Sequence, residues 1–202
     1  MKTKTIVAII FIILIINIFM NVFLVKNSHA SEKRFIYVDN AFYVKRDGSA
    51  EYPLKTITDA INMANDGDTI YVFGGSYTEN LTINKKIKLW GSVERGETII
   101  DSRFDFRYFV EITADQVEFQ NFTITDKRDI LSSPIGALLC IKGSDVVVQN
   151  NYIHHSSAYG IFVDPVSNGN FISGNKINDT KNGIMVSASY NNDLVDNTLS
   201  NC

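Results

Sequence analysis

Residues 146–153 read VVVQNNYI, and related phrases stand at 117–124 (VEFQNFTI), 170–177 (NFISGNKI) and 192–199 (NDLVDNTL). Within each phrase apolar and polar residues alternate, which is the pattern of a strand with one buried face. The last apolar residues of successive phrases are 29, 24 and 22 positions apart. So short a period of strands and turns cannot bury its apolar face alone. The phrases are therefore predicted to stack as rungs of a β-solenoid.

A second motif keeps step between these phrases. It reads Ile135-Gly136-Ala137, Tyr159-Gly160-Ile161 and Asn182-Gly183-Ile184. Each period therefore holds two or three short strands, with Gly, Asn, Asp and Ser at the joints. A leucine-rich repeat has a similar period, but it requires a dense leucine pattern that this stretch lacks. The alternation predicts an all-β fold.

One asparagine occupies the same place in three successive phrases, as Asn151, Asn175 and Asn197. An asparagine side chain both donates and accepts hydrogen bonds. Stacked in register, such side chains form a ladder from rung to rung, as in other stacked sheets. We expect this column to be structural.

The region before the repeats has a different pattern. Residues 53–64 (PLKTITDAINMA) carry apolar side chains at helical spacing, and Thr56 is well placed to cap the amino end of a helix. A turn over 65–68 and a strand over 69–73 follow. A helix before the first rung is expected to cover the open end of the core. We predict an N-terminal cap over 31–66 and β-helix rungs over 67–202.

The first thirty residues have the pattern of an export signal. Lys2 and Lys4 precede an apolar run from Ile6 to Val25, and Ser28-His29-Ala30 has small residues where a signal peptidase reads the chain. The run is also long enough to remain as an uncleaved signal anchor. Both alternatives predict a secreted, periplasmic or cell-surface protein, whose only membrane contact would be an uncleaved N-terminus.

Charge and cysteine positions bear on the partners. Residues 1–30 hold three of the 19 basic residues and none of the 22 acidic ones, so 16 basic and 22 acidic residues remain. This balance argues against a nucleic-acid partner. Cys140 and Cys202 fall about three rungs apart, too far for an internal disulfide. The last phrase ends beside residue 202 without a covering segment, so this rung is expected to self-associate or to bind a partner chain.

Residues 36–201 also resemble a known superfamily. The motifs that carry the resemblance run from Asp47-Gly48-Ser49 through Pro53–Ile57 and Gly67–Val72 to Ile87–Gly91, followed by the asparagine-rich rungs. They are similar to the pectin-lyase-like superfamily, in particular to its carbohydrate-binding and sugar-hydrolase domains and NosD-type β-helix repeat proteins. The resemblance implies a right-handed parallel β-helix with a short N-terminal capping helix. Because this branch contains both binders and enzymes, it does not decide the activity.

One column of the stacked rungs combines acids with a histidine. Asp126, His155 and Asp179 each come two residues after the last apolar position of their phrase, and Asn201 follows in the fourth. Carboxylates two rungs apart suit an inverting hydrolase, and His155 between them suits a general base. Carboxylates one rung apart would suit a nucleophile and acid pair, or a calcium site. Calcium is the only candidate cofactor, and no residue of the sequence is predicted as a metal ligand. The alternative is a column of solvated turn residues.

Five further residues are candidate substrate ligands: Lys127, Arg128, His154, Tyr159 and Asp164. The first two lie in an inserted loop and suit the carboxylate of an acidic sugar. His154 adjoins His155. Tyr159-Gly160 and Asp164-Pro165 are similar to a segment of alginate epimerases, although Val166 replaces the histidine that those enzymes require.

These observations predict an exported β-helix that binds polysaccharide along its lateral face. The enzyme alternative is a polysaccharide hydrolase, lyase or epimerase that uses Asp126, His155 and Asp179. A third alternative is a structural or adhesive surface rod without any site.

Overall fold

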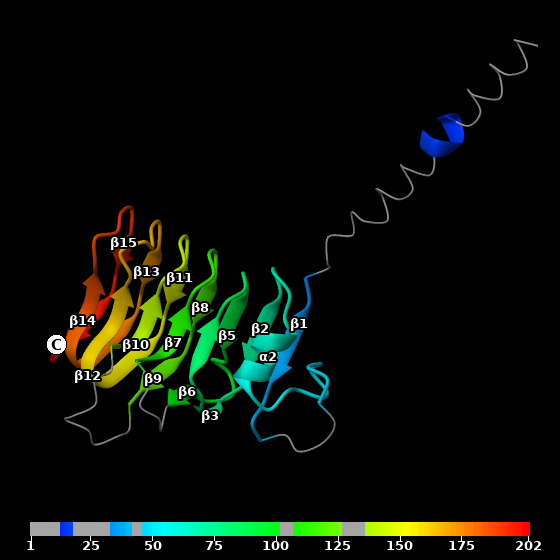
Figure 1. Ribbon diagram of the computed structural model, residues 1–202. Coiled ribbons are helices and arrows are strands. Elements are labelled where there is room, and N and C mark those ends of the chain that lie inside the picture. The colour runs from blue at the N-terminus through cyan, green and yellow to red at the C-terminus, as the bar shows by residue number, and fades with distance from the viewer. Residues whose placement is uncertain (1–12, 18–32, 42–45, 102–106, 127–135) are drawn as a thin grey trace, which may run out of the picture. The chain divides into compact units, whose positions relative to one another are not determined.

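The computed structural model describes residues 13–17, 33–41, 46–101, 107–126 and 136–202 (Figure 1). The chain divides into two compact units, Met1–Glu32 and Lys33–Cys202. In the first unit residues 13–17 are helical, with exposed side chains. No helix within the described ranges is long and apolar enough to cross a membrane. The predicted export signal falls mostly outside the described residues, and the boundaries at residues 30 and 66 stay predictions.

Seven parallel strands form the first sheet of the second unit, which we call sheet A. They lie side by side in chain order in Figure 1. Their bounds are β1 (Phe35–Val38), β2 (Thr69–Val72), β5 (Lys88–Gly91), β8 (Glu118–Gln120), β11 (Val147–Gln149), β13 (Phe171–Ser173) and β15 (Asp193–Val195). Successive residues of a strand point to opposite faces. Ile70, Leu89, Phe119 and Val148 accordingly point inward and are fully buried.

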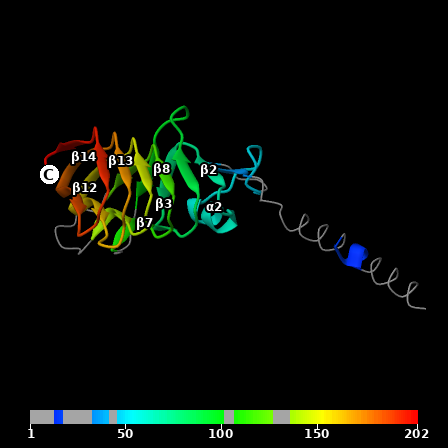
Figure 2. The same cartoon turned by 90° about the horizontal axis from the view of Figure 1, so that it is seen from above.

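The second sheet bends into two faces. The β9 face contains β3 (Gly75–Thr78), β6 (Thr98–Asp101), β9 (Thr123–Thr125), β16 (Thr198–Ser200) and the first parts of β12 (Tyr152–Val163) and β14 (Lys176–Val186). The β10 face contains β4 (Leu81–Ile83), β7 (Tyr108–Ile112), β10 (Ala137–Ile141) and the later parts of β12 and β14. In β12 the bend falls at a register shift between Ser156 and Tyr159. Each rung thus runs through sheet A, the β9 face and the β10 face (Figure 2).

The register confirms the repeat read from the sequence. Phe119, Val148, Ile172 and Leu194 are direct partners across β8, β11, β13 and β15. These partners are separated by 29, 24 and 22 residues, the spacing of the phrases. All strand pairs are parallel, and the strand interiors share one apolar core. The predicted all-β solenoid is therefore confirmed.

The predicted asparagine ladder is also present. The Oδ1 atom of Asn175 accepts from the backbone N–H of Asn151 at 3.0 Å and from its Nδ2 at 2.9 Å. Asn197 accepts from Asn175 in the same way. A second ladder, which the sequence analysis missed, joins Asn170 to Asn192 at the preceding turn. Each ladder supplies an acceptor for a buried backbone N–H that would otherwise lack a partner.

Helix α2 (Ile57–Met63) contacts β1, β2 and β4 at the amino end of the solenoid. The Thr56 hydroxyl accepts from the Asp59 N–H at 3.1 Å, which confirms the predicted cap residue. The helix is shorter than the apolar pattern over 53–64 indicated. Leu54 instead forms a β-bridge with Val38, and Thr56 and Ala64 have extended backbones. The buried residues of the helix are Ile57, Ala60 and Ile61.

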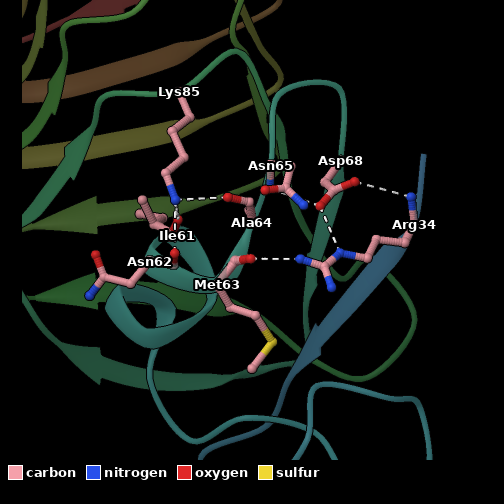
Figure 3. Close-up of polar contacts among 8 residues, drawn as sticks. All are labelled: Arg34, Ile61, Asn62, Met63, Ala64, Asn65, Asp68 and Lys85. Carbon is pink, nitrogen blue, oxygen red and sulfur yellow. Dashed lines mark hydrogen bonds and ion pairs between the residues drawn. The ribbon is translucent and has the colours of Figure 1, made fainter. Parts of the chain in front are cut away.

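Charged side chains hold both ends of α2 in place. The Glu79 carboxylate accepts from the N–H groups of Ile57 and Thr58, both at 2.9 Å. At the other end Lys85 Nζ donates to the carbonyls of Ile61, Asn62 and Ala64 at 2.7 to 2.9 Å (Figure 3). These contacts satisfy backbone groups that a helix leaves unpaired at its ends, with charges that complement its dipole.

Candidate functional site

The acid and histidine column lies at the bend between the β9 and β10 faces. We call Asp126, His155, Asp179 and Asn201 the corner column. Its register is confirmed, because His154 pairs with both Thr125 and Asn178, the residues directly before Asp126 and Asp179. The Asp126 N–H donates to the His155 carbonyl at 3.3 Å, and Asn201 Nδ2 donates to Asp179 Oδ1 at 3.1 Å.

The backbone of the corner column is that of a tight turn. His155, Asp179 and Asn201 have φ angles of 57°, 50° and 51°, and all three are exposed. Asn and Asp tolerate this left-handed conformation, which is unusual for histidine. Asp126, by contrast, is buried. The column therefore serves a repeated backbone turn, and its catalytic roles stay predictions.

His155 also contacts the strand that leads into the corner. Its Nδ1 lies beside Nδ1 of His154, and the tautomers of the two rings decide which nitrogen donates a hydrogen bond. The His154 ring stacks on Tyr152 with 4.4 Å between the ring centroids. The predicted ligands Lys127 and Arg128 lie outside the described residues. Of the predicted ligands, only His154 therefore lies beside the corner column in the described part of the chain.

Tyr159 lies on the β10 face, on the far side of the bend, and Asp164 directly follows the end of β12. Tyr159 pairs with Ala137, which in turn pairs with Tyr108. The Asp164 N–H donates to the carbonyl of Ile141 at 2.9 Å, one residue before Lys142. The predicted site residues are thus divided between a turn and a strand face.

The β10 face bears a hollow of about 420 Å³, which we call the lateral groove. It is lined by Asn80, Leu81, Thr82, Arg107, Tyr108, Glu111 and Lys142. Strands β4 and β7 contribute Leu81, Thr82, Tyr108 and Glu111 to this lining, and Lys142 directly follows β10, the strand that pairs with β7. These polar residues could not be found from the repeat, because Arg107, Tyr108 and Lys142 lie outside the repeated phrases. Tyr108 and Glu111 lie on β7, Arg107 directly precedes that strand, and Lys142 directly follows β10. Polar residues at these places on two adjacent strands are the signal that would have found them.

Two cations lie near the ring of Tyr108 in the groove. Arg107 Cζ is 5.3 Å and Lys142 Nζ is 5.4 Å from the ring centroid, within the range of cation–π attraction. Lys142 also forms an ion pair with Glu111 on the neighbouring rung. Asn80 Nδ2 donates to the Tyr108 carbonyl at 3.1 Å. Positive charge, an aromatic ring and an amide thus meet in one hollow.

The pKa shifts in and beside the lateral groove keep Lys142 positively charged and the Cys140 thiol protonated. The hydrogen bond to Glu111 raises the pKa of Lys142, so its ammonium stays charged. Burial raises the pKa of Cys140 to about 11, and Tyr108 hydrogen-bonds to this thiol. Burial also raises the pKa of Tyr108. A thiol with so high a pKa is a poor nucleophile at neutral pH. The groove is therefore equipped to bind an anionic group.

The described residues contain no group of three histidine, cysteine or acidic side chains placed to hold a metal ion. Calcium binding, considered above for stacked carboxylates, stays a prediction. Cys140 is buried and Cys202 is exposed, and both are free thiols.

Comparison with known proteins identifies the fold. A family model described as "Right handed beta helix region" matches residues 87–202, more than half of the chain. It confirms the predicted right-handed β-helix. Among curated proteins, none matches the chain.

Solved structures with similar folds include a pectin methylesterase in complex with a hexasaccharide (18% identity, TM-score 0.49). Others are the pectin methylesterase PemA from Erwinia chrysanthemi (17%, 0.46) and a rhamnogalacturonan lyase (12%, 0.47). The alignments cover 71%, 72% and 84% of this chain and 55%, 54% and 62% of those chains, respectively. The chain thus spans little more than half the length of these structures.

Proposed function

The chain belongs to the family of right-handed β-helix regions, and we propose that it is an exported protein of this family that binds an acidic polysaccharide in its lateral groove. The observation that carries the proposal is the placement of Arg107 and Lys142 within cation–π distance of the Tyr108 ring. Export is inferred from the sequence pattern of residues 1–30.

The chemistry of the groove suits a sugar acid. A guanidinium offers paired N–H donors that match a carboxylate, and Arg107 is exposed. The aromatic ring of Tyr108 offers an apolar surface to the C–H face of a sugar ring. Thr82 and Asn80 add a hydroxyl and an amide within the same hollow. A neutral sugar offers no carboxylate to Arg107 and Lys142, so an acidic glycan is favoured.

The Lys142–Glu111 ion pair adds selectivity. A bound carboxylate has to share Lys142 with Glu111, and the Glu111 carboxylate repels a misplaced anion. Exposed ion pairs contribute only about 0.2–1 kcal/mol, so this exchange of partners costs little.

The proposal is tested by measuring retention of the full-length protein by polygalacturonate and by alginate. Lys142→Met is expected to weaken retention by the two uronate polymers about fivefold, which corresponds to about 1 kcal/mol. Lys176→Met is the matched control, because Lys176 Nζ also lies 5.4 Å from a tyrosine ring, that of Tyr152 on the β9 face. Equal effects of the two substitutions, or no retention by any uronate polymer, would overturn the proposal.

The same samples are assayed for new reducing or unsaturated ends. Ends that appear with the wild type and vanish with His155→Ala would assign the corner column to the enzyme alternative. The structural rod predicts neither retention nor new ends.

A further inference from the structure

The outer face of sheet A carries an uncharged column that runs from rung to rung. The strand registers make Tyr37, Tyr71, Trp90, Gln120, Gln149 and Ser173 successive partners. We call these six residues the outer strip. Their strand neighbours Ile70, Leu89 and Val148 are fully buried, so the strip points away from the core. All of its members are partly exposed.

Aromatic rings cluster at the amino end of the strip. Tyr37 lies 6.1 Å from Phe73, with 20° between the ring planes, and Tyr71 meets Phe73 edge-on at 5.4 Å. The Tyr71 hydroxyl donates to Ser92 Oγ at 3.3 Å, which ties the ring to the next turn. Rings held in this way lose little conformational freedom when a ligand binds.

Amides follow the rings along the same line. Gln149 Nε2 donates to Ser173 Oγ at 2.8 Å, so this amide is oriented along the column. Charges beside the strip neutralise one another, because Lys88 Nζ lies 2.7 Å from Glu118 Oε1. Lys88 Nζ also lies 5.3 Å from the centroid of the Trp90 ring, and Arg95 Cζ lies 4.4 Å from that of Phe73. The strip itself contains no charged side chain, whereas Arg107 and Lys142 both line the lateral groove.

We propose that the outer strip is a second glycan-binding surface, which takes an uncharged stretch of an extended polysaccharide. Sugar rings offer an apolar C–H face to aromatic rings and hydroxyl groups to amides, and the strip provides both kinds of partner. Adjacent strands lie about 4.8 Å apart. This spacing is close to the rise of one sugar in an extended chain, so successive sugars meet successive rungs. The proposal rests on the proposed function only for the class of ligand.

The test measures binding of the full-length protein to soluble barley β-glucan and to polygalacturonate in parallel. Trp90→Ala is expected to weaken glucan binding about tenfold, the loss of one stacking partner, while Trp90→Phe retains most of it. Gln149→Met, which keeps the apolar stem and removes the amide, is expected to weaken glucan binding without disturbing the aromatic cluster. Circular dichroism checks that each variant is folded, and Lys142→Met is expected to leave glucan binding unchanged.

Absence of glucan binding by the wild type would overturn the proposal. So would glucan binding that survives both Trp90→Ala and Gln149→Met. Self-association that requires Trp90 in the absence of glycan, measured by sedimentation, would assign the strip to a second copy of the chain instead. If the wild type binds glucan but not polygalacturonate, the proposed function of the groove is rejected and the proposal for the strip stands.

Discussion

The side-chain amide of Asn151 donates to Oδ1 of Asn175 on the next rung, 2.9 Å away, and both side chains are buried. The same Oδ1 atom accepts from the Asn151 backbone N–H. A turn that repeats in three successive rungs therefore satisfies its backbone through the rung that follows. This relationship keeps the faces of these rungs in register.

Asn175→Ala is expected to lower the free energy of unfolding by about 3 kcal/mol, because it leaves buried donors on Asn151 and the carbonyl of Val148 without their partner. Urea denaturation measures the loss. Asn150→Gly is the control, since Asn150 is exposed and its φ of 55° suits glycine. Similar losses in both variants would refute the structural role of the ladder.

Lys85→Met is expected to loosen the capping helix, because Lys85 Nζ binds three carbonyls at its carboxyl end. A loss of about 1–2 kcal/mol follows from removing charged hydrogen bonds of this kind. Hydrogen exchange of the amides of α2 is expected to become faster, while exchange in β11 and β13 stays slow. Lys86→Met, at the exposed neighbouring position, serves as the control. Unchanged exchange in α2 would contradict the prediction.

Acid is expected to destabilise the cap through Asp68. Burial alone would raise the pKa of this carboxyl, but hydrogen bonds from Asn65 and Arg34 outweigh burial and lower it. A depressed folded pKa stabilises the protein above the unfolded value of about 3.9 and loses this effect as the pH falls through the folded value. Asp68→Asn should therefore flatten the loss of stability below about pH 4, measured by urea denaturation. Asp59→Asn, exposed on α2, should not.

The two thiols are expected to react at very different rates. Cys140 is fully buried and its pKa is raised to about 11, whereas Cys202 is exposed. Since the thiolate is the reactive form, iodoacetamide at about pH 8 should label Cys202 in the native protein and Cys140 only after unfolding. Mass spectrometry of tryptic peptides distinguishes the two sites. Native labelling of both thiols at equal rates would show that the β10 face opens readily.

The rungs were predictable because alternation and the asparagine column are repeated in the sequence itself. The register of His155 with Asp126 and Asp179 followed from counting residues, and the structure confirms it. The ends of α2 were predicted less accurately, because the β-bridge between Leu54 and Val38 is a tertiary contact that helical spacing does not reveal.

The groove could not be found by looking for repetition. Glu111 and Lys142 form an ion pair between two neighbouring rungs. The places that they occupy are not filled by the same residue type in successive repeats. Such a site consists of residues that differ from rung to rung. It can be predicted only when one already knows which residues of each strand point outward. The bend near Tyr159, which carries a register shift, explains why the predicted ligands Tyr159 and His154 fall on different faces.

Hydroxyl-radical footprinting of the full-length protein with and without an oligogalacturonate tests the central proposal most directly. We expect the oligosaccharide to protect Tyr108 in the lateral groove and to leave the oxidation of Trp90, which lies on sheet A, unchanged. Protection of His155 without protection of Tyr108, or no protection at any residue at saturating oligosaccharide, would contradict it.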